Sequence, residues 1–160
     1  MPRTAIYAGT FDPVTLGHMD IIDRAAEIFE RVILAVAVET PKDTLFTLKE
    51  RVAMARKIVK HLPNVEVESF TGLLVNHAKA RGVYVLLRGL RAYSDFEYEF
   101  QMALTNRKLA PEIETLFMMP NEIHSYVSSS TVREVARLGG DTSGFVPPLV
   151  DAAIRKKLAR

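Results

Sequence analysis

The sequence predicts an α/β protein, with one domain over residues 1–160 built on a doubly wound, five-stranded parallel sheet. Two observations predict this fold. Five short runs rich in apolar and β-branched residues alternate along the chain with segments whose apolar residues recur at helical spacing. Several of the runs are apolar without interruption, as is typical of parallel strands that are buried on both faces. Alternating strands and helices favour right-handed crossovers and therefore a Rossmann-like sheet.

The five expected strands are rich in Val, Ile, Leu and Phe and lie between polar or turn residues. They cover residues 4–8, 32–38, 65–70, 83–87 and 115–119. The first helix is expected over about residues 16–30, because Ile22, Ala25 and Phe29 fall on one stripe of it. No linker, internal repeat or low-complexity tract interrupts the alternation.

Capping boxes, in which Ser or Thr precedes Glu by three residues, predict where further helices begin. The pattern occurs at Thr47, Ser94 and Thr131. The glycine pair 139–140 is expected to end the helix after Thr131, and the proline pair 147–148 precedes a last short helix.

Composition and charge are those of an ordinary globular protein, with 48% hydrophobic and 25% charged residues. The chain has no cysteine and hence no disulfide or thiolate metal site, which fits a reducing compartment. No signal peptide is visible, and no apolar stretch approaches the roughly 20 residues that span a bilayer. We therefore expect a cytoplasmic protein without a membrane contact. The net charge of +2 is too small to indicate a nucleic-acid partner, and none is expected.

Every segment with chemically suggestive residues follows an expected strand. The segments are 9–18, 40–42, 72–74, 88–91 and 120–130. In a doubly wound parallel sheet, ligands bind beyond the carboxyl ends of the strands, where the strand order reverses. The sequence therefore predicts one site at this edge of the sheet.

The decapeptide 9–18 is the most informative of these segments, because it predicts a strand end, a glycine turn and the start of a helix. A helix N-terminus offers unpaired N–H groups and a partial positive charge, which suit a phosphate. His18 in the first turn adds a donor that can be protonated near neutral pH, and Thr10 adds a hydroxyl. The alternatives are that His18 only caps or packs at the helix start and that Thr10 only stabilises the turn.

Arg88 and Arg91 flank Gly89 directly after an expected strand. Guanidinium groups bind phosphate through paired hydrogen bonds, and glycine lets a nucleotide approach the backbone. A single arginine there would more often be a solvated surface charge, but the pair favours anion recognition. The cluster 128–131, Ser-Ser-Ser-Thr, precedes a helix, so one hydroxyl is expected to cap it. The other hydroxyls and the free N–H groups could hold a phosphate.

Several common motifs are missing. The chain has no GxxxxGK loop, no GxGxxG and no GxSxG elbow, which argues against P-loop enzymes, dinucleotide oxidoreductases and serine hydrolases of that type. The four histidines lack metal-ligand spacing, so no metal site is expected. Two of them, His61 and His77, are expected at the surface or in an interface.

Residues 15–18, Thr-Leu-Gly-His, resemble the T/HxGH signature of the nucleotidylyltransferase superfamily. Lys42, the run 87–91 (Leu-Arg-Gly-Leu-Arg), the acidic-aromatic run 95–99 and the serines 128–130 follow in the expected order. With these motifs, the chain resembles the bacterial phosphopantetheine adenylyltransferases over essentially its full length.

The resemblance implies an adenylyltransferase that moves AMP from ATP to 4′-phosphopantetheine, giving dephospho-coenzyme A and pyrophosphate. It also implies Mg²⁺ carried with ATP, a homo-oligomer that is usually a hexamer, and coenzyme A as a feedback ligand. Two alternatives stay open. One is a nucleotidylyltransferase that uses nicotinamide mononucleotide or a cytidylyl acceptor, and the other is a non-catalytic nucleotide-sensing module on the same fold.

The resemblance assigns roles to residues of this chain. The catalytic residues that it implies are His18 and Thr10. The acceptor-binding residues that it implies are Thr10, Lys42, Leu74 and Arg88. The ATP-binding residues that it implies are Thr10, Phe11, His18, Gly89, Leu90, Arg91, Glu99, His124, Ser125, Tyr126, Val127, Ser128, Ser129 and Ser130. Without the resemblance, Lys42 would be interpreted as loop surface, Leu74 as core and Glu99 as a solvated helix residue. His124 stands where the family has a bulky aromatic residue.

Overall fold

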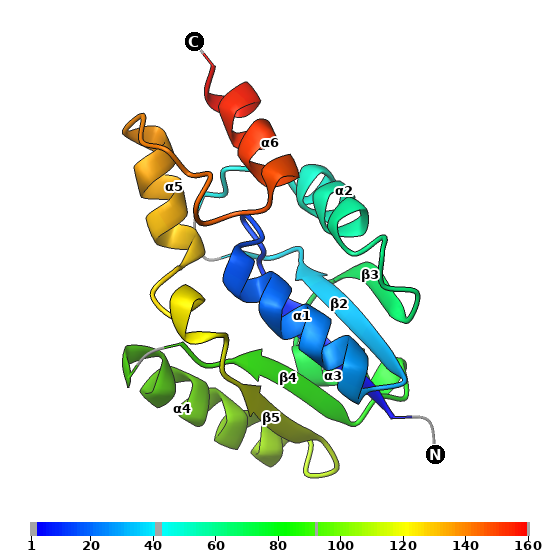
Figure 1. Cartoon of the computed structure of the whole chain (residues 1–160). Helices are drawn as coiled ribbons and strands as arrows, with labels where there is room; N and C mark the ends of the chain where they lie inside the picture. The colour runs from blue at the N-terminus through cyan, green and yellow to red at the C-terminus, as the bar shows by residue number, and fades with distance from the viewer. Residues whose placement is uncertain (1–2, 41–42, 92, 160) are drawn as a thin grey trace.

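The computed structural model describes residues 3–40, 43–91 and 93–159. The strands within these ranges are β1 (Thr4–Gly9), β2 (Arg31–Ala37), β3 (Val65–Phe70), β4 (Val85–Gly89) and β5 (Glu114–Met118). The helices are α1 (Leu16–Ile28), α2 (Leu48–Ile58), α3 (Leu74–Ala80), α4 (Tyr93–Leu109), α5 (Ser129–Arg137) and α6 (Pro148–Leu158), with a 3₁₀ turn, η1 (Glu122–His124). All strand pairs are parallel, in the order β3-β2-β1-β4-β5 (Figure 1). The predicted fold class is confirmed.

Helices cover both faces of the sheet, because successive residues of a strand point to opposite faces. On one face, Tyr7 of β1 and Leu34 of β2 share a core with Ile22 of α1. On the other face, Ile6 packs in a second core with Val75 of α3. Helices α5 and α6 lie beyond the carboxyl ends of the strands, where they form a third core with α2 (Figure 1). None of the helices in the described ranges has the length and apolarity that crossing a bilayer requires.

The strand order reverses between β1 and β4. The chain moves outward from β1 to β2 and β3 and then returns to place β4 on the other side of β1. Tyr7 of β1 lies opposite Leu87 of β4, so the carboxyl ends of the two strands are adjacent. A crevice forms where connections leave in opposite directions from neighbouring strands. Segments 9–18 and 88–91 meet at this switch point, as the sequence predicts.

Two helix starts differ from the prediction. Helix α4 begins at Tyr93, so Ser94 lies within its first turn rather than at the N-cap. Helix α5 begins at Ser129, and the side chain of Ser128 accepts a hydrogen bond from the Thr131 N–H. Thr131 is therefore not the N-cap, because Ser128, three residues earlier, has the extended backbone and the side-chain oxygen that capping requires.

Candidate active site

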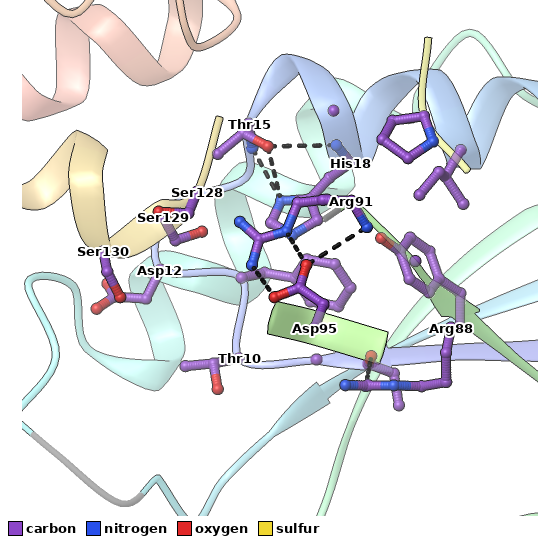
Figure 2. A pocket seen from close by; sticks show the side chains of 18 of the residues that line it. Thr10, Asp12, Thr15, His18, Arg88, Arg91, Asp95, Ser128, Ser129 and Ser130 are labelled. Carbon is purple, nitrogen blue, oxygen red and sulfur yellow. Dashed lines mark hydrogen bonds and ion pairs between the residues drawn. The ribbon is translucent and has the colours of Figure 1, made fainter. Parts of the chain in front are cut away.

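A cavity opens at the carboxyl ends of β1 and β4 (Figure 2). Three segments wall it: the end of β1 with the loop into α1, the end of β4 with the residues after it, and the start of α5. The residues that line it include Tyr7, Gly9, Thr10, Phe11, Asp12, Thr15, Gly17, His18, Arg88, Gly89, Arg91, Asp95, Glu99, Ser128, Ser129, Ser130 and Arg133. The fold thus brings most of the predicted polar side chains together.

The loop after β1 is a fixed support for the residues that follow it. The buried Asp12 carboxylate accepts hydrogen bonds from the N–H groups of Leu45 (2.8 Å) and Phe46 (2.9 Å). Phe11 has a φ of 50°, which is uncommon for a bulky residue and strains the backbone. Its buried ring packs edge-on against the His18 ring at 5.0 Å between centroids, and this packing offsets the strain.

Thr10 is held in place through its backbone by a buried arginine. One guanidinium nitrogen of Arg51, from α2, donates to the carbonyl oxygens of Thr10 (2.8 Å) and Ala37 (2.9 Å). These two carbonyls lie at the ends of β1 and β2, so Arg51 joins the two strand ends. The Thr10 hydroxyl has no partner among the described residues, which leaves it available to a ligand in the cavity.

His18 is a neutral hydrogen-bond donor. Its Nδ1 accepts a hydrogen bond from the Thr15 N–H at 3.0 Å, while the Thr15 hydroxyl accepts one from the His18 N–H at 3.3 Å. Because Nδ1 is an acceptor, the proton of the neutral ring is on Nε2. Burial, together with the charges of Arg91 and Arg88, lowers the pKa of His18 to about 3. The expectation that the ring gains a proton near neutral pH is therefore wrong.

The interpretation that His18 caps the helix start is confirmed, because the ring closes a capping box with Thr15. Capping uses only one of the two ring nitrogens. Nδ1 fixes the ring to the helix start, and this contact leaves Nε2 unpaired among the described residues. The ring is therefore pre-oriented for a ligand oxygen.

The lowered pKa of His18 makes the protein less stable in acid. Between the ordinary pKa of about 6.5 and the folded value of about 3, the unfolded chain binds a proton here that the folded chain does not bind. The contribution of His18 to the free energy of unfolding is fully present above about pH 6.5 and decreases as the pH falls toward the folded-state pKa of about 3. Between pH 7 and pH 5, we expect wild type to lose about 2 kcal/mol more than His18→Ala. Urea unfolding of both proteins at one protein concentration measures this difference, and identical pH dependence would contradict it.

The partly exposed Arg88 and the buried Glu99 form an ion pair at the inner wall. The guanidinium donates to both carboxylate oxygens, at 2.9 and 2.7 Å, and its third nitrogen donates to the Ala8 carbonyl at 2.8 Å. Burial alone would lower the pKa of Arg88, but the hydrogen bonds and charge of Glu99 raise it above its ordinary value. Glu99 is 8% exposed, so it is not the solvated helix residue that the sequence alone suggests. Its carboxylate orients Arg88 as a permanent cation.

Arg91 is held by the helix and the loop on either side of it. It donates to the Asp95 carboxylate at 2.9 Å and to the Val127 carbonyl at 3.0 Å. The contact with Val127 joins the residues after β4 to the loop before α5. Asp95 offsets part of the positive charge of Arg91.

The serines at the start of α5 divide between capping and lining the cavity. Ser128 caps the helix, and Ser129 donates to the Pro13 carbonyl at 2.8 Å. Arg133 donates to Ser130 at 3.2 Å and also to the Asp12 carbonyl at 2.6 Å. The prediction that one hydroxyl caps the helix is confirmed. The N-terminus of α5 and the N-terminus of α1 border the same cavity. Some of their N–H groups are already paired, since Leu16 donates to the Phe145 carbonyl and His18 to the Thr15 hydroxyl.

Some predicted residues do not line this cavity. Leu90 donates its N–H to the Met118 carbonyl, and residues 124–127 lie on η1 and the loop that follows it. The ATP contacts of these residues stay predictions. Lys42 lies outside the described residues.

A second cavity lies beyond the Arg88–Glu99 pair, which lines both cavities. Leu74 lines it together with Tyr98, Met102 and Asn106 of α4. Leu74 is partly exposed there, so it is not wholly a core residue. The second cavity is more apolar at its wall than the first, because Leu73, Leu74 and Met102 contribute to it.

Several lining residues were not predicted from the sequence. Arg133 follows Ser130 by three residues, which places both on one face of α5, and Asp95 follows Arg91 by four residues, although Arg91 precedes α4. Those spacings could have identified both partners. Tyr7 carried no such signal, because an aromatic residue in an apolar strand is indistinguishable from core.

The remaining histidines lie away from the cavity. His61 is exposed and lies 3.2 Å from the Asp23 carboxylate, as expected for a surface residue. His77 is largely buried instead, with its Nε2 2.7 Å from the Glu68 carboxylate. Its ring lies against Phe70, which explains why it is not exposed. In the described part of the chain, no three acidic or histidine side chains are grouped as a metal site.

Comparisons with known proteins agree with this geometry. The cytidylyltransferase-like family model matches residues 6–135. A putative nicotinate-nucleotide adenylyltransferase from Vibrio parahaemolyticus has the same fold, with a TM-score of 0.72 and 18% identity over 96% of this chain and 99% of that chain. Nicotinic acid mononucleotide adenylyltransferase from Plasmodium falciparum has a TM-score of 0.71 and 15% identity over 98% and 96% of the two chains. Fold, cavity and family model together define a nucleotidylyltransferase.

Curated relatives narrow this class. A phosphopantetheine adenylyltransferase from Methylococcus capsulatus is 58% identical over 159 residues, which cover 99% of this chain and 98% of the relative. Another from Carboxydothermus hydrogenoformans is 52% identical and covers 99% and 98% of the two chains. The chain belongs to the phosphopantetheine adenylyltransferase family.

Proposed function

We propose that the protein transfers AMP from ATP to 4′-phosphopantetheine. A phosphate oxygen of the acceptor attacks the α-phosphorus of ATP and forms a new P–O–P bond. The bond from the α-phosphorus to the β-phosphate oxygen breaks, and pyrophosphate leaves with the electron pair. A phosphate monoester is mostly dianionic at pH 7, so the attack needs no covalent enzyme intermediate. Catalysis then consists of aligning two polyanions and stabilising their charge.

The proposal rests on the position of Arg88, whose side chain lines both cavities. We assign the first cavity to ATP and the second to the pantetheine arm, with Leu74 and Tyr98 beside it. Arg88 and Lys42 then bind the acceptor phosphate where the two ligands meet. This arrangement directs the acceptor phosphate toward the switch point rather than into solvent.

The polar groups of the first cavity divide between the reacting and the leaving phosphates. Nε2 of His18 and the hydroxyl of Thr10 donate to the α-phosphate, where charge develops during transfer. Arg91 and the serines 128–130 bind the β- and γ-phosphates, aided by the free N–H groups of α5. We assign Mg²⁺ to ATP itself, since a cation bound through substrate phosphates needs few protein ligands.

We also propose that the protein forms a homo-oligomer, a hexamer by family likeness. Phe96 and Phe100 of α4 are 53% and 49% exposed and stack at 5.7 Å between ring centroids. Leu116 and Phe117 of the edge strand β5 are 43% and 37% exposed. Exposed apolar surface of this extent is typical of an interface. Sedimentation equilibrium should give a hexamer and Phe100→Glu a smaller species; a mass of 17.9 kDa for wild type would contradict the proposal.

Coenzyme A is proposed as a feedback ligand, because it contains both the pantetheine arm and an adenylate and could therefore occupy both cavities. A cytoplasmic location is proposed as well, in keeping with the cysteine-free sequence.

Pyrophosphate release tests the proposed acceptor. Mg-ATP is incubated with 4′-phosphopantetheine, with nicotinamide mononucleotide or with no acceptor, and each reaction is repeated with EDTA. We expect release with phosphopantetheine and Mg²⁺ only. Release with the mononucleotide alone would keep the reaction class and overturn the acceptor. Bound ATP without release in any reaction would favour a nucleotide-sensing module.

A further inference from the structure

Tyr7 places a hydroxyl that has no hydrogen-bond partner among the described residues at the wall of the active-site cavity. The residue lies on β1 and is 4% exposed, with its ring 5.4 Å from the Phe11 ring and 6.4 Å from the His18 ring between centroids. Its hydroxyl oxygen lies 3.6 Å from the position that a Cβ would take on Gly89, at the end of β4. No described residue forms a hydrogen bond with this hydroxyl.

A hydroxyl that faces a cavity and has no protein partner can donate its hydrogen bond to a ligand that enters the cavity. Packing alone does not require the oxygen, because phenylalanine would fill the same space with the same ring contacts. The hydroxyl therefore points to a group that enters the cavity with the substrate.

The charges around Tyr7 indicate what that group is. Arg88 and Arg91 both act electrostatically on the phenol, yet their guanidinium groups bond to Glu99 and Asp95 instead. Burial raises the pKa of the Tyr7 phenol above its ordinary value, although the two arginines oppose this. The phenol keeps its proton at neutral pH and is a donor. Arg88 and Arg91 act on the phenol together with the Glu99 carboxylate, and a proton donor near two arginines that line the same cavity suits an anionic oxygen.

We infer that Tyr7 is a further substrate-binding residue, whose hydroxyl donates a hydrogen bond to an anionic phosphate oxygen beside the His18 ring. The inference rests on the proposed function, in which that oxygen belongs to ATP or to the acceptor phosphate. In ATP and in the acceptor alike, the hydrogen bond is accepted by an anionic phosphate oxygen. Tyr7 and His18 then approach the phosphate from two elements, one from β1 and one from α1.

Tyr7→Phe tests this inference in the full-length protein. Hydrogen bonds to charged groups support an expected 10- to 100-fold loss in kcat/KM with Mg-ATP and phosphopantetheine. The melting temperature of the ligand-free protein should be unchanged or higher, because the variant removes only an unpaired polar atom. Tyr84→Phe is the matched control, since Tyr84 is 54% exposed at the start of β4 and should keep wild-type kinetics.

Calorimetric titrations distinguish the two phosphate sources. A weaker dissociation constant for Mg-ATP assigns the hydroxyl to the nucleotide, and a weaker one for phosphopantetheine assigns it to the acceptor. Both results support the inference. Kinetics and both dissociation constants within twofold of wild type, or a lowered melting temperature as the sole effect, would overturn it. The ATP titration needs no turnover, so it tests Tyr7 even if phosphopantetheine proves not to be the acceptor.

Discussion

His18→Ala lowers turnover by about 10²–10³-fold and weakens ATP binding by less than about tenfold. The reason is the state of the ring. A neutral imidazole whose Nδ1 is fixed by the Thr15 N–H presents only Nε2–H to the substrate. Its hydrogen bond strengthens as charge develops on the α-phosphate, so its loss is felt mainly in the transition state. Single-turnover rates and equilibrium titration with ATP measure the two quantities separately.

His61→Ala is the matched control for this variant, because His61 is exposed and pairs with a surface carboxylate away from the cavity. We expect wild-type turnover from it. His18→Ala also removes a capping contact, so its unfolding curve is recorded at the assay temperature to show that it is folded. If ATP affinity and turnover fall by the same factor, His18 is an ordinary binding residue and the catalytic role is wrong.

Arg88→Ala raises the KM for phosphopantetheine by about 10- to 100-fold and leaves the KM for ATP nearly unchanged. The guanidinium borders both cavities and is held as a cation by Glu99, so it meets the acceptor phosphate at the junction. The variant also leaves the buried Glu99 carboxylate without its partner, which lowers stability. Initial rates with each substrate varied in turn measure the effect.

Arg88→Lys separates binding from folding, because it keeps a cation for Glu99 but lacks the two-pronged geometry that phosphate recognition uses. We expect it to fold and still to raise the KM for phosphopantetheine. Arg31→Ala is the control, since Arg31 makes the same two-pronged pair with Glu66 at the opposite end of the sheet. A folded Arg88→Lys with an unchanged KM would remove Arg88 from the acceptor site.

Much of the fold could be predicted from the sequence, because central strands buried on both faces have apolar runs that helices of this chain lack. Strand bounds were less predictable. Val83 is apolar and buried, yet its N–H closes the turn after α3 by bonding to the Ala78 carbonyl, and pairing begins only at Val85. Strand β4 therefore covers Val85–Gly89 rather than the predicted residues 83–87, and Arg88 lies within the strand instead of after it.

The site was predictable where a motif fixes the backbone and unpredictable where burial decides the chemistry. The loop and helix start around His18 could be predicted, but its neutral state could not, because burial and two arginines distant in sequence cause it. Glu99 and Tyr7 were hidden for the same reason. The position of a carboxylate on a helix and of an aromatic residue in a strand at one cavity becomes visible only when the fold brings both to the wall that Arg88 lines.

The central claim is that AMP, and no other part of ATP, moves to the acceptor. Reactions with ATP labelled with ³²P at the α- or the γ-phosphate, in the presence of phosphopantetheine, test it most directly. We expect the α-label to be recovered in dephospho-coenzyme A and the γ-label in pyrophosphate. Recovery of the γ-label in the acceptor, or of the α-label only in free AMP, would contradict it.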